Sequence, residues 1–184
     1  MKDELGFLNM KIRNRKTTVL SKWVTLMARE VEEDKEESGR WFHSLLQPDY
    51  VAVLAETPAH EIVLVRQYRP ALERTFLELP AGLLDTKEDP ACCAARELEE
   101  ETGFKASGPL ILLGNLCPDQ GRLENRLWCY YAEGVESVPN WRPEAGVERV
   151  VMPKSDFFHA MKQGKFEPAL HIAIVGLAML QGRF

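Results

Sequence analysis

The sequence predicts an α/β (α+β) fold in which a small antiparallel β piece precedes the main domain. Two observations predict it: only extended patterns occur before about residue 47, whereas extended and helical patterns are mixed after it. The chain has 184 residues, which suits one domain with a small accessory piece. Its 45% hydrophobic and 28% charged residues are typical of a folded protein and exclude wholesale disorder.

The N-terminal β piece is predicted over residues 1–47. We expect a long strand, a polar turn and a short strand, over 17–32, 33–39 and 40–46 respectively. Trp23 lies in the first of these strands and Trp41 in the second. The sequence Gln47-Pro48-Asp49 then breaks the extended pattern, so we place the start of the main domain, 48–184, at this break.

The main domain contains strands and helices in mixed order. We expect strands over 51–55, 61–67, 110–114, 127–131 and 149–152, and helices over 90–102, over 155–164 and from about residue 168. Asp89 and Pro90 are typical of a helix start, with the aspartate as the cap and the proline in the first helical position. Gly103 is expected to end that helix, because glycine readily adopts the left-handed conformation found there.

The charge and the cysteines narrow the class of protein. A net charge of -5 argues against a protein that coats nucleic acid or an anionic membrane, so neither is an expected partner. No apolar run approaches the roughly 20 residues that span a bilayer, and the N-terminal residues lack a secretory apolar core. The four cysteines form no CxxC pair, which favours free thiols in a reducing cytoplasm.

The helix over 90–102 carries a cluster of carboxylates. Glu97, Glu100 and Glu101 are spaced i, i+3 and i+4, so their side chains project from one helix face. Like charges at this spacing destabilise an exposed helix by a few tenths of a kcal/mol per pair, roughly, and a divalent cation reverses that effect. Mg²⁺ binds through one or two carboxylates together with substrate phosphates. A solvated acidic helix face is the simpler alternative for such a cluster.

Nine residues in and around this helix fall within a span of 23 residues: Gly82, Glu88, Arg96, Glu97, Leu98, Glu100, Glu101, Gly103 and Phe104. Their types and spacing resemble the Nudix box. Gly82 permits a tight backbone turn, and Arg96 is well placed to pair with Glu88 and brace the loop against the helix. Leu98 lies on the other helix face, where it would anchor the helix in the core. The resemblance implies the Nudix α/β/α sandwich with a mixed β-sheet.

The resemblance also implies a metal-dependent reaction. Nudix enzymes hydrolyse a diphosphate linkage attached to a nucleoside, so the expected cofactor is Mg²⁺, with Mn²⁺ as a substitute. Glu97 and Glu101 correspond to the principal metal ligands, Glu100 assists them, and the carbonyl of Ala81 supplies a further ligand. Arg96 and Glu100 belong to the implied catalytic group.

The general base of this family lies outside the box. In related enzymes it precedes the strand that leads to a Pro-Lys-x-Asp segment, which corresponds here to residues 153–156. Glu144, in the sequence Pro-Glu-Ala-Gly, is therefore the first candidate, and Glu148 is the second. A Ser or Cys nucleophile is not required, so we interpret three further residues as structural or surface groups: Ser155, His159 and His171.

The sequence upstream of the box indicates a substrate class. The segments 65–70 and 78–82 resemble the ADP-ribose and nucleoside-diphosphate-sugar pyrophosphatase branch of the family. In that branch the arginine corresponding to Arg69 contacts the diphosphate, and the glutamate corresponding to Glu78 contacts the substrate or a metal-bound water. Leu83, which follows directly, is expected to contact the substrate as well.

The resemblance continues into the N-terminal piece. The segments 22–26 and 39–41 are similar to the tryptophan-bearing strands of ADP-sugar pyrophosphatases, in which the tryptophans sandwich the base. It implies that Trp23 and Trp41 stack on the base and that the chain is a homodimer sharing its N-terminal pieces, although two core tryptophans would give the same pattern. The loop over 117–121 departs from the branch, so the preferred sugar stays open.

Two other functions remain compatible with these residues. The chain could hydrolyse another diphosphate, such as a dinucleotide or a nucleoside triphosphate. It could instead be a catalytically silent module that binds a nucleotide sugar and regulates a partner, although such modules usually lose carboxylates of the box, and all of them are present here.

Overall fold

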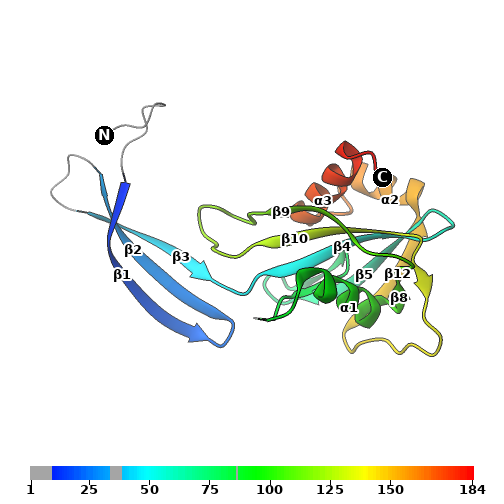
Figure 1. Cartoon of the computed structure of the whole chain (residues 1–184), viewed down its shortest axis with the longest axis horizontal. Coiled ribbons are helices and arrows are strands. Elements are labelled where there is room, and N and C mark those ends of the chain that lie inside the picture. The colour runs from blue at the N-terminus through cyan, green and yellow to red at the C-terminus, as the bar shows by residue number, and fades with distance from the viewer. Residues whose placement is uncertain (1–9, 34–38, 86) are drawn as a thin grey trace. The chain divides into compact units, whose positions relative to one another are not determined.

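The computed structural model describes residues 10–33, 39–85 and 87–184, which form two compact units (Figure 1). The first unit comprises the described part of Met1–Pro48 together with Cys117–Asn125. The second unit comprises Asp49–Leu116 and Arg126–Phe184, again where described. The boundary predicted near residue 47 and the roles assigned to its two sides stay predictions.

The first unit is a three-stranded antiparallel sheet. Its strands, in the order β1-β2-β3, are β1 (Met10–Ser21), β2 (Val24–Glu33) and β3 (Arg40–Leu46). The prediction of one continuous strand over 17–32 was wrong, because the chain reverses at Lys22 and Trp23. The hydroxyl of Ser21 accepts the N–H of Trp23 at 3.2 Å, and this local bond supplies a turn without glycine or proline. Of the predicted polar turn, residues 34–38 lie outside the described residues.

The segment Cys117–Asn125 attaches to this sheet at β3. Leu45 and Leu123 form a parallel bridge, and the N–H of Leu45 donates to the carbonyl of Arg122 at 2.7 Å. The guanidinium of Arg29 on β2 donates to both carboxylate oxygens of Glu124, at 2.7 and 2.6 Å. These bonds give the segment a defined place in the first unit.

The second unit is built on a mixed sheet of seven strands. The path β12-β5-β4-β10-β9 forms its body, β6 pairs with β5, and β7 pairs with β4. Only the pairing of β10 with β4 is parallel among the paired strands of this sheet. The strands are β4 (Tyr50–Glu56), β5 (Glu61–Arg69), β6 (Arg74–Glu78), β7 (Ala81–Leu83), β9 (Ile111–Leu116), β10 (Leu127–Glu133) and β12 (Val147–Pro153). A separate two-stranded pair joins β8 (Phe104–Lys105) to β11 (Glu136–Ser137).

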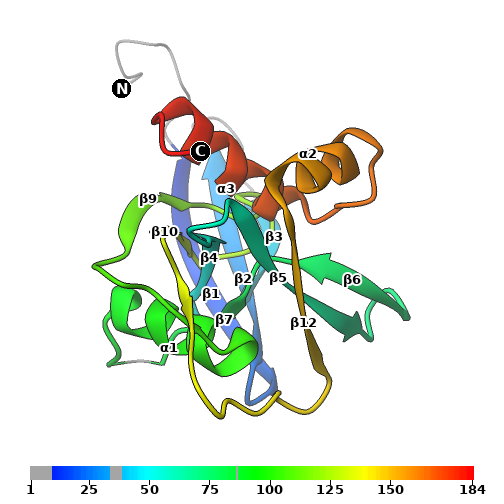
Figure 2. The same cartoon turned by 90° about the vertical axis from the view of Figure 1, so that its right-hand side faces the viewer.

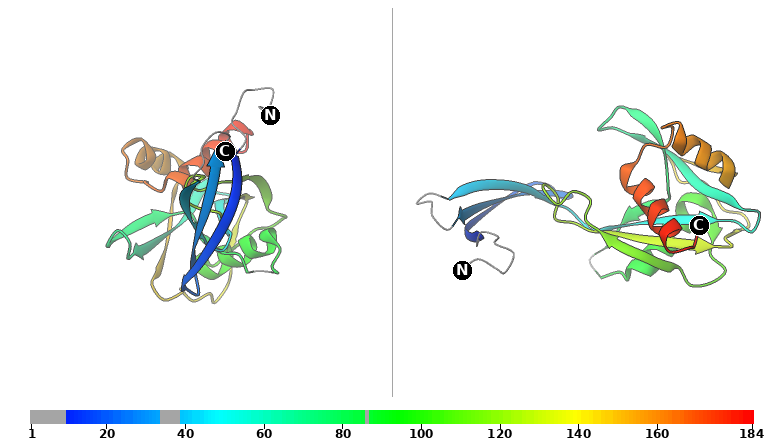
Figure 3. Two further views of the ribbon diagram at one scale, coloured as in Figure 1. Left: turned by 90° about the vertical axis from the view of Figure 1, so that its left-hand side faces the viewer. Right: turned by 90° about the horizontal axis from the view of Figure 1, so that it is seen from above.

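Helices cover both faces of the mixed sheet, as Figure 2 shows. On one face, α1 (Pro90–Thr102) packs Leu98 and Cys93 against Val51 and Val53 of β4. On the other face lie α2 (Lys154–Lys162) and α3 (Ala169–Leu180), which Figure 3 shows from two further directions. Their buried side chains share a core with alternate residues of β4. Residues that alternate along a strand point to opposite faces of its sheet, so β4 is buried on both. This is the expected α/β/α sandwich.

Helix α1 has the boundaries that the sequence predicts. The side chain of Asp89 accepts the N–H groups of Ala91 and Cys92, at 2.9 and 3.2 Å. Gly103 is left-handed, with a φ of 66°, and its N–H donates to the carbonyl of Glu99 at 2.8 Å. Both helix ends are therefore fixed by local bonds, which positions the carboxylates of the helix firmly.

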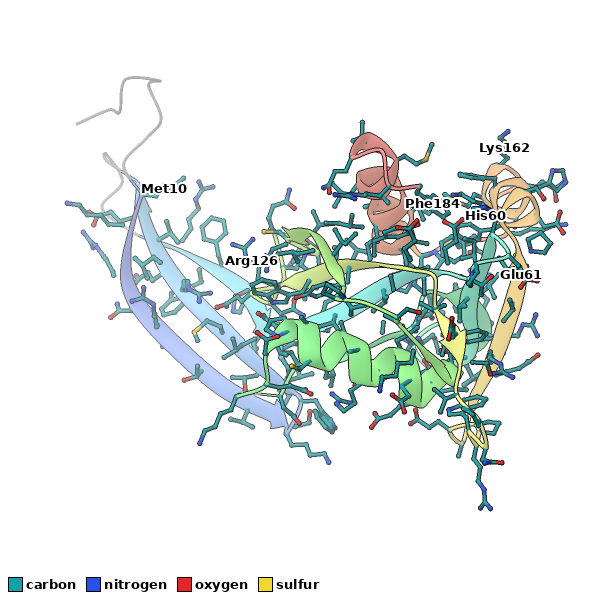
Figure 4. The ribbon with its side chains drawn as sticks, turned by 45° about the vertical axis from the view of Figure 1, so that its right-hand side comes forward. Met10, His60, Glu61, Arg126, Lys162 and Phe184 are labelled. Carbon is teal, nitrogen blue, oxygen red and sulfur yellow. The ribbon has the colours of Figure 1, made fainter. Side chains whose placement is uncertain are left out.

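A buried carboxylate connects the end of the β4–β5 hairpin to α2. Glu56 accepts from the ring of His60 at 2.6 Å, from the hydroxyl of Tyr131 at 3.0 Å and from Lys154 at 3.1 Å. The ammonium of Lys154 also lies over the ring of Phe184, and Figure 4 labels His60 and Phe184 at this end of the unit. Three donors lower the pKa of Glu56 against the opposing effect of its burial, so it is held as a carboxylate.

Among the described helices, none has the length and apolarity to cross a membrane.

Candidate active site

The carboxylates of α1 face the backbone of β7. A carboxylate oxygen of Glu101 accepts the N–H of Ala81 at 2.9 Å. A Cβ built on Gly82 would collide with the carboxylate of Glu97, so that position admits only glycine while Glu97 keeps its place. The sequence pattern brings these residues together as expected: β7 supplies the backbone and α1 the side chains.

Arg96 holds the loop and the helix together. Its Nε and Nη2 donate to the two carboxylate oxygens of Glu88, at 3.0 and 2.9 Å, which is the predicted pairing. Its Nη1 donates to Glu97 at 2.7 Å and to Glu100 at 2.9 Å. One guanidinium thus orients three carboxylates through charge-assisted hydrogen bonds.

Burial and mutual repulsion act on two carboxylates of the helix. Burial raises the pKa of Glu101 to about 7, and the negative charges of Glu97 and Glu144 add to the rise against the hydrogen bond from Ala81. Burial likewise raises the pKa of Glu97, while Arg96 opposes the rise. Carboxylates that disfavour one another's charged forms, in a partly buried place, favour a bound cation.

The donor set fits a hard divalent cation that keeps part of its water shell. Carboxylate oxygens are the preferred protein ligands of Mg²⁺, which binds through few of them and completes its shell with water and substrate phosphates. Within the described ranges, no three His, Cys, Asp or Glu side chains already stand in the arrangement of a metal cage.

Glu144 shares a pocket of about 590 Å³ with the carboxylates of α1. The pocket is lined by Glu97, Glu99, Glu100, Trp141, Arg142 and Glu144. Glu144 lies in the loop between β11 and β12, where its carbonyl accepts the N–H of Val147 at 3.2 Å. The second candidate base, Glu148, lies on β12, and its carboxylate accepts from Arg66 of β5 at 2.7 Å. The two candidates therefore differ, since only Glu144 lines the pocket.

Arg69, which is expected to contact the diphosphate, is paired with Glu78, which is expected to contact the substrate or a metal-bound water. Nε and Nη2 of Arg69 donate to the two oxygens of the buried Glu78, at 2.8 and 2.6 Å. These hydrogen bonds raise the pKa of Arg69. Leu83, at the end of β7, exposes its side chain. A partly exposed guanidinium held by a buried carboxylate is preorganised for an anionic ligand.

The two tryptophans of the first unit lie far apart along its sheet. Trp23 is in the β1–β2 turn, whereas Trp41 of β3 pairs with Glu30, seven residues further along β2. At the rise of a strand this corresponds to about 20 Å, so the two rings of one unit do not enclose a common base. Both rings are exposed, at 52% and 38%, and the ammonium groups of Lys22 and Lys16 lie over them.

His171 has a structural position. It is buried on α3, and its Nδ1 accepts the backbone N–H of Leu79 at 3.0 Å. Burial lowers the pKa of His171 to about 4, so the ring is neutral at physiological pH. It holds the strand end between Glu78 and Ala81, in agreement with the interpretation of this histidine as a structural group.

Trp141 was not anticipated from the sequence. Its indole N–H donates to the carbonyl of Glu100 at 3.1 Å, and a Cβ built on Gly103 would collide with its ring. A tryptophan three residues before the candidate base was the available signal. Its partner is a helix end about 40 residues away in the chain, which local patterns do not reveal.

Comparisons with known proteins place the chain in a family. The model of the NUDIX domain matches residues 46–170. The chain is 40% identical over 93 residues to a "Methanol dehydrogenase activator" of Bacillus methanolicus, which covers 50% of each chain. It is 54% identical over 59 residues to an "ADP-ribose pyrophosphatase" of Bacillus subtilis (strain 168), which covers 32% of each. The chain thus spans half or less of the length of these two relatives.

A solved structure shares the fold over nearly the whole chain. It is the "Crystal structure of ADP compounds hydrolase", with a TM-score of 0.80 and 22% identity, covering 95% of this chain and 97% of that one. At this identity the likeness shows the fold alone. The family match covers more than half of the chain and includes the whole box with its carboxylate helix, so the chain belongs to the NUDIX domain family.

Proposed function

We propose that this chain hydrolyses the diphosphate linkage of ADP-ribose or a related nucleoside diphosphate sugar, giving a nucleoside monophosphate and a sugar phosphate. The observation that carries the proposal is the pocket in which Glu144 joins Glu97 and Glu100 of α1. The relative named an ADP-ribose pyrophosphatase supports the substrate class.

Glu97 and Glu101 would hold Mg²⁺, or Mn²⁺ in its place, with Glu100 and the carbonyl of Ala81 as further ligands. Such a cation neutralises charge on the diphosphate and makes a bound water more acidic. The protein's own contribution is to keep the ligands ionised and oriented. Arg96 does this by donating to Glu97 and Glu100 from one guanidinium nitrogen.

Glu144 is the proposed base. It takes a proton from the attacking water as the water oxygen bonds to phosphorus, and the bridging phosphorus–oxygen bond breaks with its electron pair on the leaving phosphate. The runner-up, Glu148, is held by Arg66 in a partly exposed ion pair. Its carboxylate would have to leave that pair before it could accept the proton.

Two groups of residues are proposed to contact the substrate. Arg69, preorganised by Glu78, would donate to the diphosphate, and Leu83 would pack on the substrate. Trp23 and Trp41 would stack on the base, and since their backbone positions in one unit are about 20 Å apart along the sheet, a sandwich takes one ring from each of two copies. A homodimer in which the N-terminal units are shared follows from this proposal.

A regulatory function is the second candidate. The relative of Bacillus methanolicus is named an activator of methanol dehydrogenase, and the chain matches half of its length. On that alternative the pocket would bind a nucleotide sugar without turnover, and a partner protein would respond to the bound state.

A substrate panel tests the proposal. ADP-ribose, other nucleotide sugars, dinucleotides and nucleoside triphosphates are incubated with and without Mg²⁺ or Mn²⁺, and the products are identified by mass. We expect metal-dependent release of a nucleoside monophosphate and a sugar phosphate. Activity on nucleoside triphosphates alone would refute the substrate class, and tight binding without products at saturating metal would favour the regulatory function.

A further inference from the structure

The loop that carries Glu144 is tied to the C-terminal end of α1. The indole N–H of Trp141 donates to the carbonyl of Glu100 at 3.1 Å, and its ring lies against Gly103. Earlier in the same connection, the N–H of Val138 donates to the carbonyl of Gly103 at 2.7 Å. The loop therefore meets the helix end at two successive points.

Arg149 of β12 lies over the indole ring of Trp141. Its guanidinium carbon lies 4.8 Å from the centre of the Trp141 ring, and its Nη1 donates to the carbonyl of Thr102 at 3.0 Å. A helix leaves its last carbonyls without partners inside the helix. Trp141 and Arg149 supply partners for two carbonyls near that end. We call these two side chains, with their bonds to the helix end, the clamp.

The clamp acts on Glu144 through a short piece of backbone. Only two residues separate Trp141 from Glu144, and one of them is Pro143, whose ring fixes its own φ. On the far side, the N–H of Val147 donates to the carbonyl of Glu144 at 3.2 Å. A residue tethered this closely on both sides has little freedom to leave the pocket that it lines.

We propose that Trp141 is a positioning residue: by anchoring this loop to the end of α1, it holds Glu144 beside the carboxylates of the helix. The inference rests on the proposed function, in which Glu144 is the base. In this role Trp141 acts through the loop backbone and not by touching the reacting atoms. This positioning role predicts that loss of the indole slows the chemical step and leaves substrate affinity nearly intact.

The test compares two substitutions of Trp141 with a matched control. Trp141→Ala is expected to lower kcat about 100-fold with KM within about threefold, because a small displacement of a catalytic group has an effect of this size. Trp141→Phe keeps the ring and loses one hydrogen bond, so a loss of roughly fivefold is expected. Trp128→Phe removes an indole N–H from β10, where its partner is Asp49, and should keep the wild-type rate. If Trp141→Ala does not fold, Arg149→Lys takes its place, because it removes the planar guanidinium that lies over the indole.

Hydrogen exchange gives a readout that needs no activity. The peptide over residues 138–147 should exchange faster in Trp141→Ala than in the wild type or in Trp128→Phe, while the core strand 51–55 stays protected. A double-mutant cycle then links the loop to the base: in the Glu144→Gln background, Trp141→Ala should cost little further rate. Unchanged exchange, or faster exchange with an unchanged kcat, would overturn the proposal.

The same experiments separate this inference from the proposed function. An equal loss of rate from Trp141→Ala in both backgrounds shows that Trp141 does not act through Glu144, which also overturns the proposal. A near-normal rate in Glu144→Gln removes the base assignment and the positioning role with it. A wild-type chain that hydrolyses none of the nucleotides refutes the proposed function, whereas the exchange rates still decide whether Trp141 anchors the loop.

Discussion

At the scale of single residues, the site depends on how closely Glu97 and Glu101 approach the backbone of β7. Glu101 is buried and accepts one backbone N–H, and Glu97 fills the space that a side chain at position 82 would need. Both carboxylates have raised pKa values because they are buried, and the negative charge of Glu97 adds to the rise at Glu101. The fold thus places the two carboxylates where their negative charge is unfavourable unless a cation is bound.

Glu101→Gln separates metal binding from folding. The glutamine can still accept the N–H of Ala81, and it removes one of the repelling charges, so the melting temperature without metal should not fall. We expect the stabilisation by Mg²⁺ to disappear, since ligand binding raises the apparent stability only where the ligand binds. Turnover should fall by about 100-fold or more, as for loss of a metal ligand. Thermal melts with and without Mg²⁺ measure this, and a retained metal-induced shift would contradict the ligand role.

Gly82→Ala acts on the same site from the other side. The new methyl group would occupy the place of the Glu97 carboxylate, which must then move away from β7. Overpacking of this kind costs about 1–3 kcal/mol of unfolding free energy. We expect the rate of hydrolysis to fall by a larger factor than the folding equilibrium constant. Urea unfolding measures the stability, and a rate assay measures the hydrolysis. Gly108→Ala is a matched control, because a Cβ there meets no neighbour within 4 Å.

At the scale of elements, α3 contributes to the site through His171. Its ring accepts the N–H of Leu79, directly between Glu78 and the Pro80-Ala81 segment, and burial lowers the pKa of His171 to about 4. A helix from the opposite face of the sheet therefore fixes the strand end that faces α1. The bond requires the neutral ring, because the protonated ring has no acceptor atom.

The lowered pKa predicts how stability depends on pH. Between the unfolded pKa of about 6.5 and the folded value of about 4, the unfolded chain binds a proton that the folded chain does not. Stability should therefore be complete above that window and fall as the pH decreases through it, by about 3 kcal/mol from this group. Urea unfolding at several pH values measures it, with His171→Asn as the variant that cannot titrate. Parallel pH profiles for the two proteins would contradict this origin.

Local patterns explain which elements were predictable. Helix α1 was predicted with its boundaries, because Asp89, Pro90 and Gly103 act through contacts within one turn. The β1–β2 turn was missed, because Ser21 closes it with a side-chain bond and the apolar pattern continues across it. Short strands such as β7 depend on a distant partner, β4, rather than on their own composition.

At the scale of the whole molecule, only those residues of the candidate site that belong to a continuous sequence motif could be predicted. The box residues are close in sequence, so the pairing of Arg96 with Glu88 was predictable. The anchoring of Trp141 on Glu100 joins two segments by tertiary contact, and no spacing in the chain encodes it. The separation of Trp23 and Trp41 became visible only with the register of the sheet.

The proposed homodimer makes a prediction for mixed variants. If each base lies between Trp23 of one copy and Trp41 of the other, then Trp23→Ala and Trp41→Ala should each raise KM. Random exchange of the two variants gives heterodimers in which one site has both tryptophans and the other has neither, so about a quarter of all sites regain wild-type KM. Steady-state kinetics of the mixture measure this. No recovery after verified subunit exchange would contradict shared sites.

The parallel pairing of β10 with β4 has a consequence for folding during synthesis on the ribosome. Leu127 pairs with Tyr50, which was synthesised 77 residues earlier. At a translation rate of about 5–20 residues per second, roughly 4–15 seconds pass between the synthesis of β4 and that of its neighbour β10. During that interval an apolar strand, destined for burial on both faces, has an open hydrogen-bonding edge. Nascent chains should therefore depend on holding chaperones until residue 133 has emerged, and a slow rate of translation would lengthen that dependence.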